Sequence, residues 1–84
     1  MTNELYEKHC WALVDLDAMQ SNLALIQKTV GAPVCCVVKA DAYGHGMEQI
    51  ASAALREGAD YLAAAFCEEG VRLRSAGFDA PILL

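Results

Sequence analysis

The sequence is poor in basic residues and has no long apolar segment. Six lysines and arginines stand against eleven aspartates and glutamates among its 84 residues, which gives a net charge of −5. Nucleic-acid binding depends on clustered basic side chains that neutralise phosphates, and the few basic residues here are scattered. A membrane-spanning helix needs roughly 20 predominantly apolar residues, and no stretch approaches that length. We therefore predict that the protein binds neither nucleic acid nor membranes.

Signals for secretion and for a disulfide framework are missing as well. Residues 1–8 lack the apolar core of a signal peptide, so we expect a cytoplasmic protein. The four cysteines are sparse and form no Cys-x-x-Cys pair. We predict that they are reduced, buried and apolar in role; we assign no metal site, and zinc ligation is the less favoured alternative. Cys35 and Cys36 are adjacent in an apolar run and should point to opposite faces of a strand.

Apolar residues make up 56% of the sequence, and their spacing indicates alternating strands and helices. The apolar and aromatic segment 9–14 predicts a strand. The next segment predicts a helix that begins at Asp15 or Asp17 and ends at Gly31. Its apolar residues recur every three or four positions as one stripe, which consists of Leu16, Met19, Leu23, Ile26 and Val30. Further strands are predicted at 34–38, 61–65 and 81–84, helices at 47–57 and 68–75, and a glycine-containing loop at 40–46.

This alternation with short connections predicts an α/β fold with a parallel sheet. The run 34–38 has no polar alternation, which is typical of a parallel strand covered on both faces. Lys39 directly follows this run. In α/β barrels the active site lies at the carboxyl ends of the strands, so a lysine at this point is well placed for chemistry. Many lysines in such positions are inert and solvated, and position alone does not establish a function.

The loop after Lys39 adds groups that suit a ligand. A lysine amine can condense with a carbonyl compound. Gly44 and Gly46 allow the backbone to approach a ligand closely, and the phenol of Tyr43 can donate to a phosphate oxygen. The helix predicted at 47–57 directs backbone N–H groups toward the loop. Each signal is weak alone, and together they favour a binding site at this loop.

Other polar and aromatic residues receive structural interpretations. We interpret His45 as a hydrogen-bonded structural residue rather than a proton carrier. Asp41 is interpreted as a loop-capping carboxylate rather than a partner of the site. Trp11 is expected to pack, and His9 shows nothing beyond what surface or packing residues show.

Residues 37–46, with the sequence VVKADAYGHG, closely resemble the pyridoxal-phosphate attachment motif of the alanine racemases. Residues 11–18 followed by Asn22 resemble the opening strand and first helix of that family. Its next βα unit is matched by Glu69, Leu73, Arg74, Gly77, Pro81 and Ile82. The resemblance covers nearly the whole chain from Trp11 onward. It implies an α/β fold that is a partial (β/α)8 TIM-type barrel, with the first βα units only, preceded by one strand and one helix.

The resemblance also implies an activity and its residues. The parent enzyme would interconvert L- and D-alanine with pyridoxal 5′-phosphate as cofactor and would supply D-alanine for cell-wall synthesis. Lys39 would be the catalytic residue and the point of covalent attachment of the cofactor, and Tyr43 would bind the cofactor phosphate. A tyrosine from the second domain of a partner subunit would serve the opposite face of alanine. The parent enzyme would therefore be a homodimer whose active sites are shared between subunits.

The length of the chain bounds this interpretation. A complete barrel of this kind takes about 250 residues. We therefore expect residues 1–84 to be the N-terminal part of a pyridoxal-phosphate-binding barrel domain in a longer protein. The strand near residues 9–15 is expected to associate with a C-terminal β domain that these residues do not include.

Two alternatives stay open at this point. A serine or broad-specificity amino-acid racemase, or another barrel enzyme with the same cofactor, shares much of the lysine motif. A non-catalytic α/β fragment that binds partners through its open sheet edges is the second alternative, because most of a barrel is absent.

We predict that the 84-residue chain alone does not racemise alanine. The opposite-face tyrosine and the remaining cofactor contacts lie outside it, and so small a chain buries only about 60% of its unfolded surface. The measurement is the formation of D-alanine from L-alanine by the purified chain with added cofactor. Turnover near that of an intact racemase would contradict the prediction.

Overall fold

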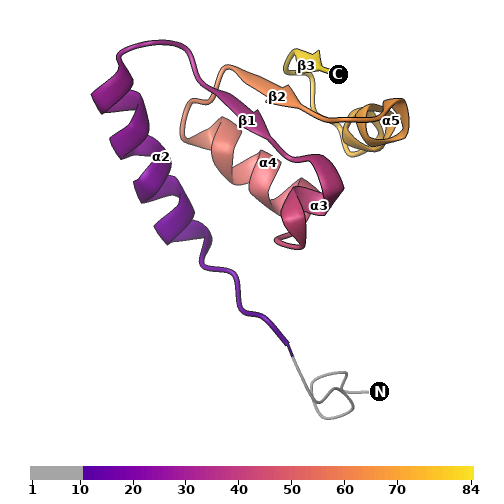
Figure 1. The fold of residues 1–84 in the computed structure, drawn as a ribbon, viewed down its shortest axis with the longest axis horizontal. Helices are drawn as coiled ribbons and strands as arrows, with labels where there is room; N and C mark the ends of the chain where they lie inside the picture. The colour runs from indigo at the N-terminus through magenta and orange to yellow at the C-terminus, as the bar shows by residue number, and fades with distance from the viewer. Residues whose placement is uncertain (1–10) are drawn as a thin grey trace.

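The computed structural model describes residues 11–84. Along the chain these form helix α2 (Leu16–Val30), strand β1 (Cys35–Val37), a short helix α3 (Lys39–Tyr43), helix α4 (Met47–Arg56), strand β2 (Tyr61–Ala63), helix α5 (Cys67–Ser75) and strand β3 (Ile82–Leu83) (Figure 1). The three strands are parallel and lie in the order β1-β2-β3. Sequential parallel strands with helices between them confirm the predicted α/β fold of consecutive βα units.

Helix α2 has the boundaries that its capping residues predict. The Asp15 side chain accepts a hydrogen bond from the Ala18 N–H at 3.0 Å, which satisfies one of the free donors of the first turn. Gly31 ends the helix with a φ of +64°, a left-handed conformation that glycine adopts without steric cost. Over residues 11–84, every helix is too short or too polar to cross a membrane.

The apolar stripe of α2 is covered only over its first half. Leu23 is buried against Ala54 and Ala59, where α2 lies beside α4 (Figure 1). Ile26 and Val30, at the end of the predicted stripe, are 50% and 59% exposed. The predicted apolar stripe is therefore exposed at its last two residues.

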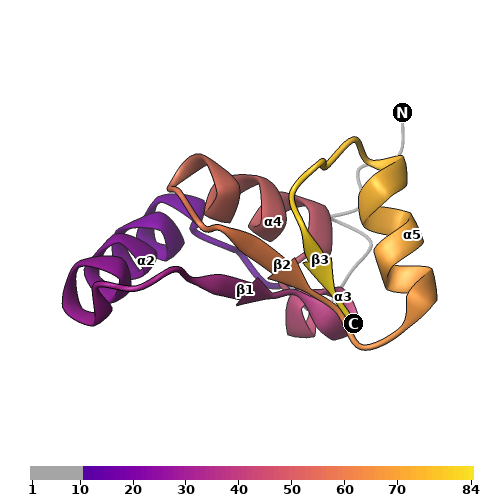
Figure 2. The same ribbon diagram turned by 90° about the horizontal axis from the view of Figure 1, so that it is seen from above.

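The core lies between the sheet and the helices α4 and α5. Strand register aligns Cys36, Leu62 and Ile82 on one face of the sheet. These residues pack against the fully buried Met47 of α4 and Leu73 of α5. Figure 2 shows α4 and α5 lying alongside the strands. This packing fixes the end of β1 relative to both helices.

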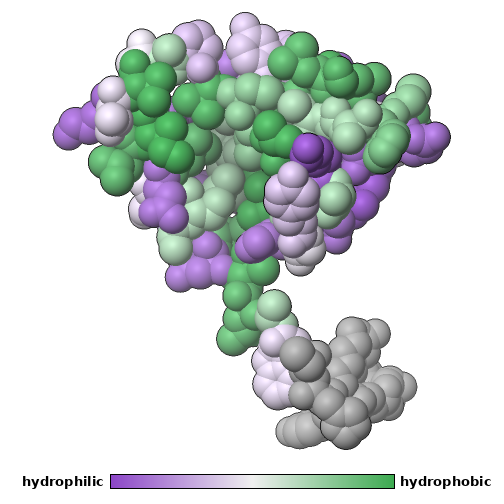
Figure 3. All heavy atoms as spheres, in the orientation of Figure 1, coloured by the Kyte–Doolittle hydropathy of each residue, from purple (hydrophilic) through white to green (hydrophobic). Residues whose placement is uncertain are grey.

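The other face of the sheet carries no helix within the described residues. Val37, Ala63 and Leu83 share this face by register, and Val37 and Leu83 are 56% and 57% exposed. In Figure 3 apolar surface extends over the strands on the side that faces the viewer. In a closed barrel this face points to the interior, where side chains of neighbouring strands cover it. The exposed apolar face is thus the one that a complete barrel would bury.

The strand predicted at residues 9–14 is not seen in the part of this segment that the structure describes. The structure assigns no strand to residues 11–14, and Trp11, which we expected to pack, is 56% exposed. Residues 9 and 10, including His9, lie outside the described residues. A strand forms only where a neighbouring strand accepts its hydrogen bonds. The association of this segment with a second domain stays a prediction.

The three cysteines within residues 11–84 are free, and their burial differs from what we predicted. Cys35, Cys36 and Cys67 are free thiols, whereas Cys10 lies outside the described residues. Cys36 faces the core and Cys35 the opposite side, as predicted for strand neighbours. Burial raises the pKa of Cys36, with a smaller contribution from Cys35. Cys35 and Cys36 are only partly buried and Cys67 is exposed, so the prediction of buried cysteines is wrong.

The core predicts the effect of truncating Leu62, which is fully buried in the middle strand. Leu62→Ala should lower the free energy of unfolding by about 2–5 kcal/mol, because it removes apolar contacts and leaves a cavity. Leu62→Met nearly conserves the volume and should lower it by less than about 1.5 kcal/mol. Denaturant unfolding of both variants measures the difference. Equal losses in the two variants would contradict the packing described for this residue.

Candidate functional site

Lys39 stands where β1 leaves the sheet. The residue before it, Val38, is fully buried, and its N–H donates to the Ala63 carbonyl of the neighbouring strand at 2.9 Å. Lys39 itself is only partly buried. Because Val38 is held by both packing and hydrogen bonding, the backbone of Lys39 is fixed at the carboxyl end of the strand. This is the position that the sequence predicted for it.

The segment after Lys39 is a left-handed helical turn, where we predicted a glycine-containing loop. Ala40, Asp41, Ala42 and Tyr43 have φ values between +53° and +56°. Left-handed backbone places Cβ close to the following carbonyl oxygen, at roughly 1–2 kcal/mol per residue. Four successive residues of this kind, none of them glycine, need support from their surroundings.

Part of this support is local. The Ala42 N–H donates to the Val38 carbonyl at 2.9 Å, and the Gly44 and Gly46 N–H groups both donate to the Asp41 carbonyl at 3.0 Å. Gly44 and Gly46, on either side of His45, also have positive φ values, of +88° and +96°. The two glycines therefore complete the turn, although they do not begin it.

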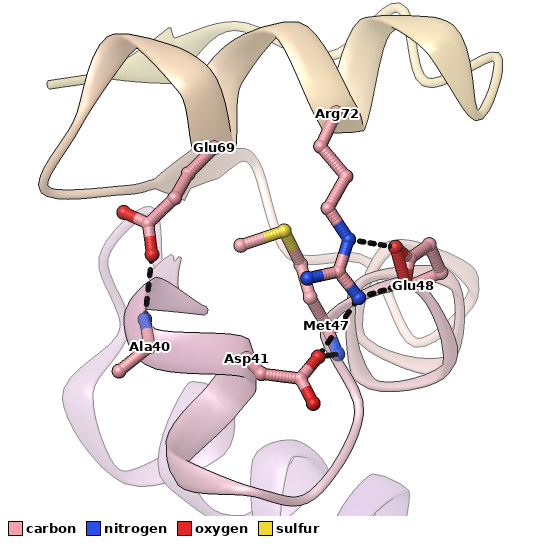
Figure 4. A network of polar contacts seen from close by, with 6 residues as sticks. All are labelled: Ala40, Asp41, Met47, Glu48, Glu69 and Arg72. Atoms are coloured by element: carbon pink, nitrogen blue, oxygen red, sulfur yellow. Dashed lines mark hydrogen bonds and ion pairs between the residues drawn. The ribbon is translucent and has the colours of Figure 1, made fainter.

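Glu69 of α5 supplies a contact from outside the turn. One carboxylate oxygen accepts from the Ala40 N–H at 2.7 Å, and the other accepts from the N–H groups of Ala65 and Phe66 at 2.8 and 3.0 Å. Figure 4 shows the bond from Ala40. The Ala40 bond, followed by those of Phe66 and Ala65, holds the pKa of Glu69 below its ordinary value of 4.5. The carboxylate thus joins the segments that follow β1 and β2.

Asp41, Glu48 and Arg72 form a second polar network, which joins the turn to α4 and α5 (Figure 4). Asp41 accepts from the Met47 N–H at 2.8 Å and from Nη2 of Arg72 at 2.9 Å. The same guanidinium donates to both carboxylate oxygens of Glu48, with an Nη2–Oε2 distance of 2.8 Å. The Met47 bond and then Arg72 lower the pKa of Asp41, Arg72 lowers that of Glu48, and the two carboxylates raise that of Arg72. Asp41 caps the first turn of α4, as interpreted from the sequence.

The turn brings Lys39 and Tyr43 together. The Nζ atom of Lys39 lies 6.0 Å from the centre of the Tyr43 ring, and Tyr43 is 71% exposed. A spacing of four residues places both side chains on one side of a helical turn. His45 is exposed, with Nδ1 2.9 Å from the Ala42 carbonyl oxygen, which suits a structural role. An amine and a phenol side by side can bind a carbonyl compound that also carries an anionic group.

Within the described residues, we compared the Lys39–Tyr43 pair with two other kinds of binding site, an apolar hollow and a metal site. A hollow of about 580 Å³ lies between α2 and β1, and neither Lys39 nor Tyr43 lines it. Within residues 11–84, no group of three histidine, cysteine, aspartate or glutamate side chains could hold a metal ion. The Lys39–Tyr43 pair at the carboxyl end of β1 therefore lies outside this hollow.

The roles of Glu69 and Arg72 were missed by the sequence interpretation. Acidic residues at the start of α5 and basic residues at its end complement the helix dipole. This pattern does not predict the contact of Glu69 with Ala40 or that of Arg72 with Asp41. One signal was present for Glu69. It is the third residue after the helix-capping position at Phe66, where a glutamate commonly reaches back to the backbone. The contacts to Ala40 and Asp41 have no comparable local signal.

Because the pKa of Glu69 is lowered in the folded protein, its carboxylate stabilises the fold at pH values above 4.5. This stabilisation is lost as the pH falls through the lowered pKa. We predict that the Ala40 amide resonance titrates with a midpoint below 4.5, and that the Met47 amide, which reports on Asp41, titrates below 3.8. Amide chemical shifts measured against pH test both. Midpoints at or above these values would contradict the described contacts.

Comparison with known proteins agrees with this fold. Residues 14–84 match the family described as "Alanine racemase, N-terminal domain". The alanine racemase of Thermobifida fusca (strain YX) is 55% identical over 73 residues, which cover 86% of this chain and 20% of that protein. The crystal structure of alanine racemase from Bacillus anthracis with bound L-Ala-P matches with a TM-score of 0.81 at 44% identity, over 84% of this chain and 19% of that chain. A histidine racemase from Leuconostoc mesenteroides subsp. sake gives a TM-score of 0.75 at 32% identity, over 82% of this chain and 19% of that chain.

The chain spans about a fifth of the length of the relatives it matches. Its three-stranded parallel sheet corresponds to the N-terminal part of the barrel in these racemases, which confirms the predicted partial barrel. The family match, the sequence identity and the shared fold agree, and the chain belongs to the alanine racemase family, where it corresponds to part of the N-terminal domain.

Proposed function

We propose that this chain supplies the cofactor-bearing lysine of a pyridoxal-phosphate-dependent alanine racemase. One observation carries the proposal. Lys39 stands at the carboxyl end of a parallel strand, with its amine beside the Tyr43 phenol on a turn that is held by neighbouring helices. Barrel enzymes place their reacting groups at this end of the sheet.

The residues present fit one part of a pyridoxal-phosphate site. The cofactor has an aldehyde and a phosphate, and Lys39 and Tyr43 offer an amine and a phenol donor. Both side chains are at least partly exposed, and Gly44 would meet no atom within 4 Å if it carried a Cβ, so the space beside the turn is open. Lys39 would hold the aldehyde end, and the Tyr43 hydroxyl would donate to the phosphate.

Bound pyridoxal phosphate supplies an electron-withdrawing ring that stabilises negative charge at the α-carbon of an amino acid. The work of this chain is then to hold and move a proton. Lys39 would act as base and acid at the α-carbon on one face, since its amine is held at the strand end. Delivery on the other face would come from residues outside this chain, in a partner subunit of a homodimer. Removal on one face and delivery on the other inverts the configuration.

Alanine is the substrate that we propose. The relatives named above from Thermobifida fusca and Bacillus anthracis are alanine racemases, and the latter was solved with bound L-Ala-P. A racemase of another or broader specificity is the second candidate, and the likeness to a histidine racemase favours it as the alternative. A panel of amino-acid substrates on the full-length protein distinguishes the two candidates.

The cellular setting belongs to the same proposal. As part of a longer cytoplasmic enzyme, the chain would contribute to supplying D-alanine for cell-wall synthesis. A non-catalytic interaction fragment is the competing hypothesis for the chain by itself. A 1:1 uptake of cofactor by the full-length protein favours the enzyme, whereas a protein that never acquires cofactor absorbance favours the interaction fragment.

We predict that borohydride reduction of the full-length protein in the presence of pyridoxal phosphate labels Lys39. The amine at the strand end is held beside the group that we expect to bind the phosphate, so it should react in preference to other lysines. Peptide mapping after reduction locates the label.

Two variants serve as controls for this assignment. Lys39→Met should abolish the label and the racemase activity together. Lys28→Met should change neither, because Lys28 lies in the last turn of α2, away from the sheet end. A label that stays after Lys39→Met, or that maps to another lysine, would exclude Lys39 as the attachment point.

A further inference from the structure

We propose that Glu69 is a positioning residue for Lys39, because its carboxylate holds the left-handed turn that carries both Lys39 and Tyr43. This inference rests on the function proposed above. Glu69 belongs to the second βα unit and lies 29 positions after Ala40, the residue that it contacts. Within the described residues, no other side chain bonds to the backbone N–H of Ala40.

The carboxylate divides its two oxygens between two strand ends. Oε2 accepts from Ala40, the residue directly after Lys39, and Oε1 accepts from Ala65 and Phe66, which follow β2. The strands β1 and β2 are hydrogen-bonded neighbours, so one side chain joins their adjacent carboxyl ends. Figure 4 shows Glu69 reaching from α5 down to the turn. A shift of the turn would break the bond to Ala40 directly.

The turn depends on such a contact because its own residues do not favour it. Ala40 and Ala42 are left-handed at φ values of +53° and +54°, where a Cβ atom is unfavourable. The bond to Glu69 fixes the peptide plane between Lys39 and Ala40, from which the left-handed turn starts. A rotation of this plane would move residues 40–43 relative to the strand end and separate the amine of Lys39 from the phenol of Tyr43.

The chemistry of the contact requires a carboxylate. Both oxygens of Glu69 face N–H donors, and an amide side chain has only one oxygen. In Glu69→Gln the NH2 group would meet either the Ala40 N–H or the N–H groups of Ala65 and Phe66. A substitution that is nearly equal in size therefore breaks one side of the contact.

The neighbouring Glu68 offers a matched control. It lies in the same first turn of α5, is exposed and takes no part in this network. Glu68→Gln removes the same charge near the same helix terminus, so it reproduces the helix-dipole effect without touching the turn. Glu69→Asp serves as a second variant, because it keeps the charge but is too short to reach Ala40 and the end of β2 together.

The experiment uses the full-length protein and compares wild type with these three variants. In the cofactor-free protein, hydrogen exchange of the Ala40 amide should be about tenfold or more faster in Glu69→Gln and Glu69→Asp, the scale set by losing a hydrogen bond to a charged group. The rate at which pyridoxal phosphate attaches should fall by a similar factor in these two variants. This rate is monitored by cofactor absorbance at a temperature well below the melting transition. Glu68→Gln should match wild type in both measurements.

Two results would overturn the inference. One is attachment in Glu69→Gln as fast as in Glu68→Gln. The other is faster exchange that is spread evenly over the whole chain, which indicates a general loss of stability. Failure of the proposed function is a separate result, since wild type would then carry no label on Lys39. In that case Ala40 exchange still shows whether Glu69 holds the turn.

Discussion

The left-handed turn directly after Lys39 is the constraint on which the candidate site depends. Four successive residues other than glycine adopt φ values of +53° to +56°, each at roughly 1–2 kcal/mol. A whole domain is stable by only about 5–15 kcal/mol, so such a turn persists only where packing and hydrogen bonds compensate for it. Besides the local backbone bonds, the compensating groups are Glu69, which binds Ala40, and Arg72, which binds Asp41. Both come from α5, so the geometry of the first βα unit is completed by the second.

The same polar groups serve the fold and the site at once. Asp41 caps the first turn of α4 while its other partner, Arg72, draws α5 toward that helix through Glu48. Asp41 is exposed and Glu48 is only partly buried, and isolated ion pairs at the surface contribute little stability. These carboxylates mainly orient the segments that they join. Each of their partners is a backbone N–H or a planar guanidinium, whose hydrogen bonds have a fixed direction. The positions of the Lys39 amine and the Tyr43 phenol are therefore determined by contacts of neighbouring residues, in which these two side chains take no part.

Most of the architecture could be predicted from the sequence, because local patterns determine it. Asp15 and Gly31 bound α2, and the apolar run before Lys39 forms a parallel strand, since capping and burial act over a few residues. The handedness of the turn could not be predicted in this way. Ala40 and Ala42 favour right-handed backbone by themselves, and the group that opposes this preference is 29 positions away. The strand predicted near the start also depends on a distant partner, and residues 11–14 show none.

The exposed apolar face explains how the rest of such a site would be completed. Val37 and Leu83 are more than half exposed on the face of the sheet that a closed barrel buries, and Lys39 stands at the end of the strand that carries Val37. Covering this face would remove apolar surface from water, at about 25 cal/mol per Å², and would also exclude water from the strand ends. Electrostatic interactions strengthen where water is excluded. The described residues thus orient the amine, and closure of the barrel would supply low-dielectric surroundings for the role that we propose for it.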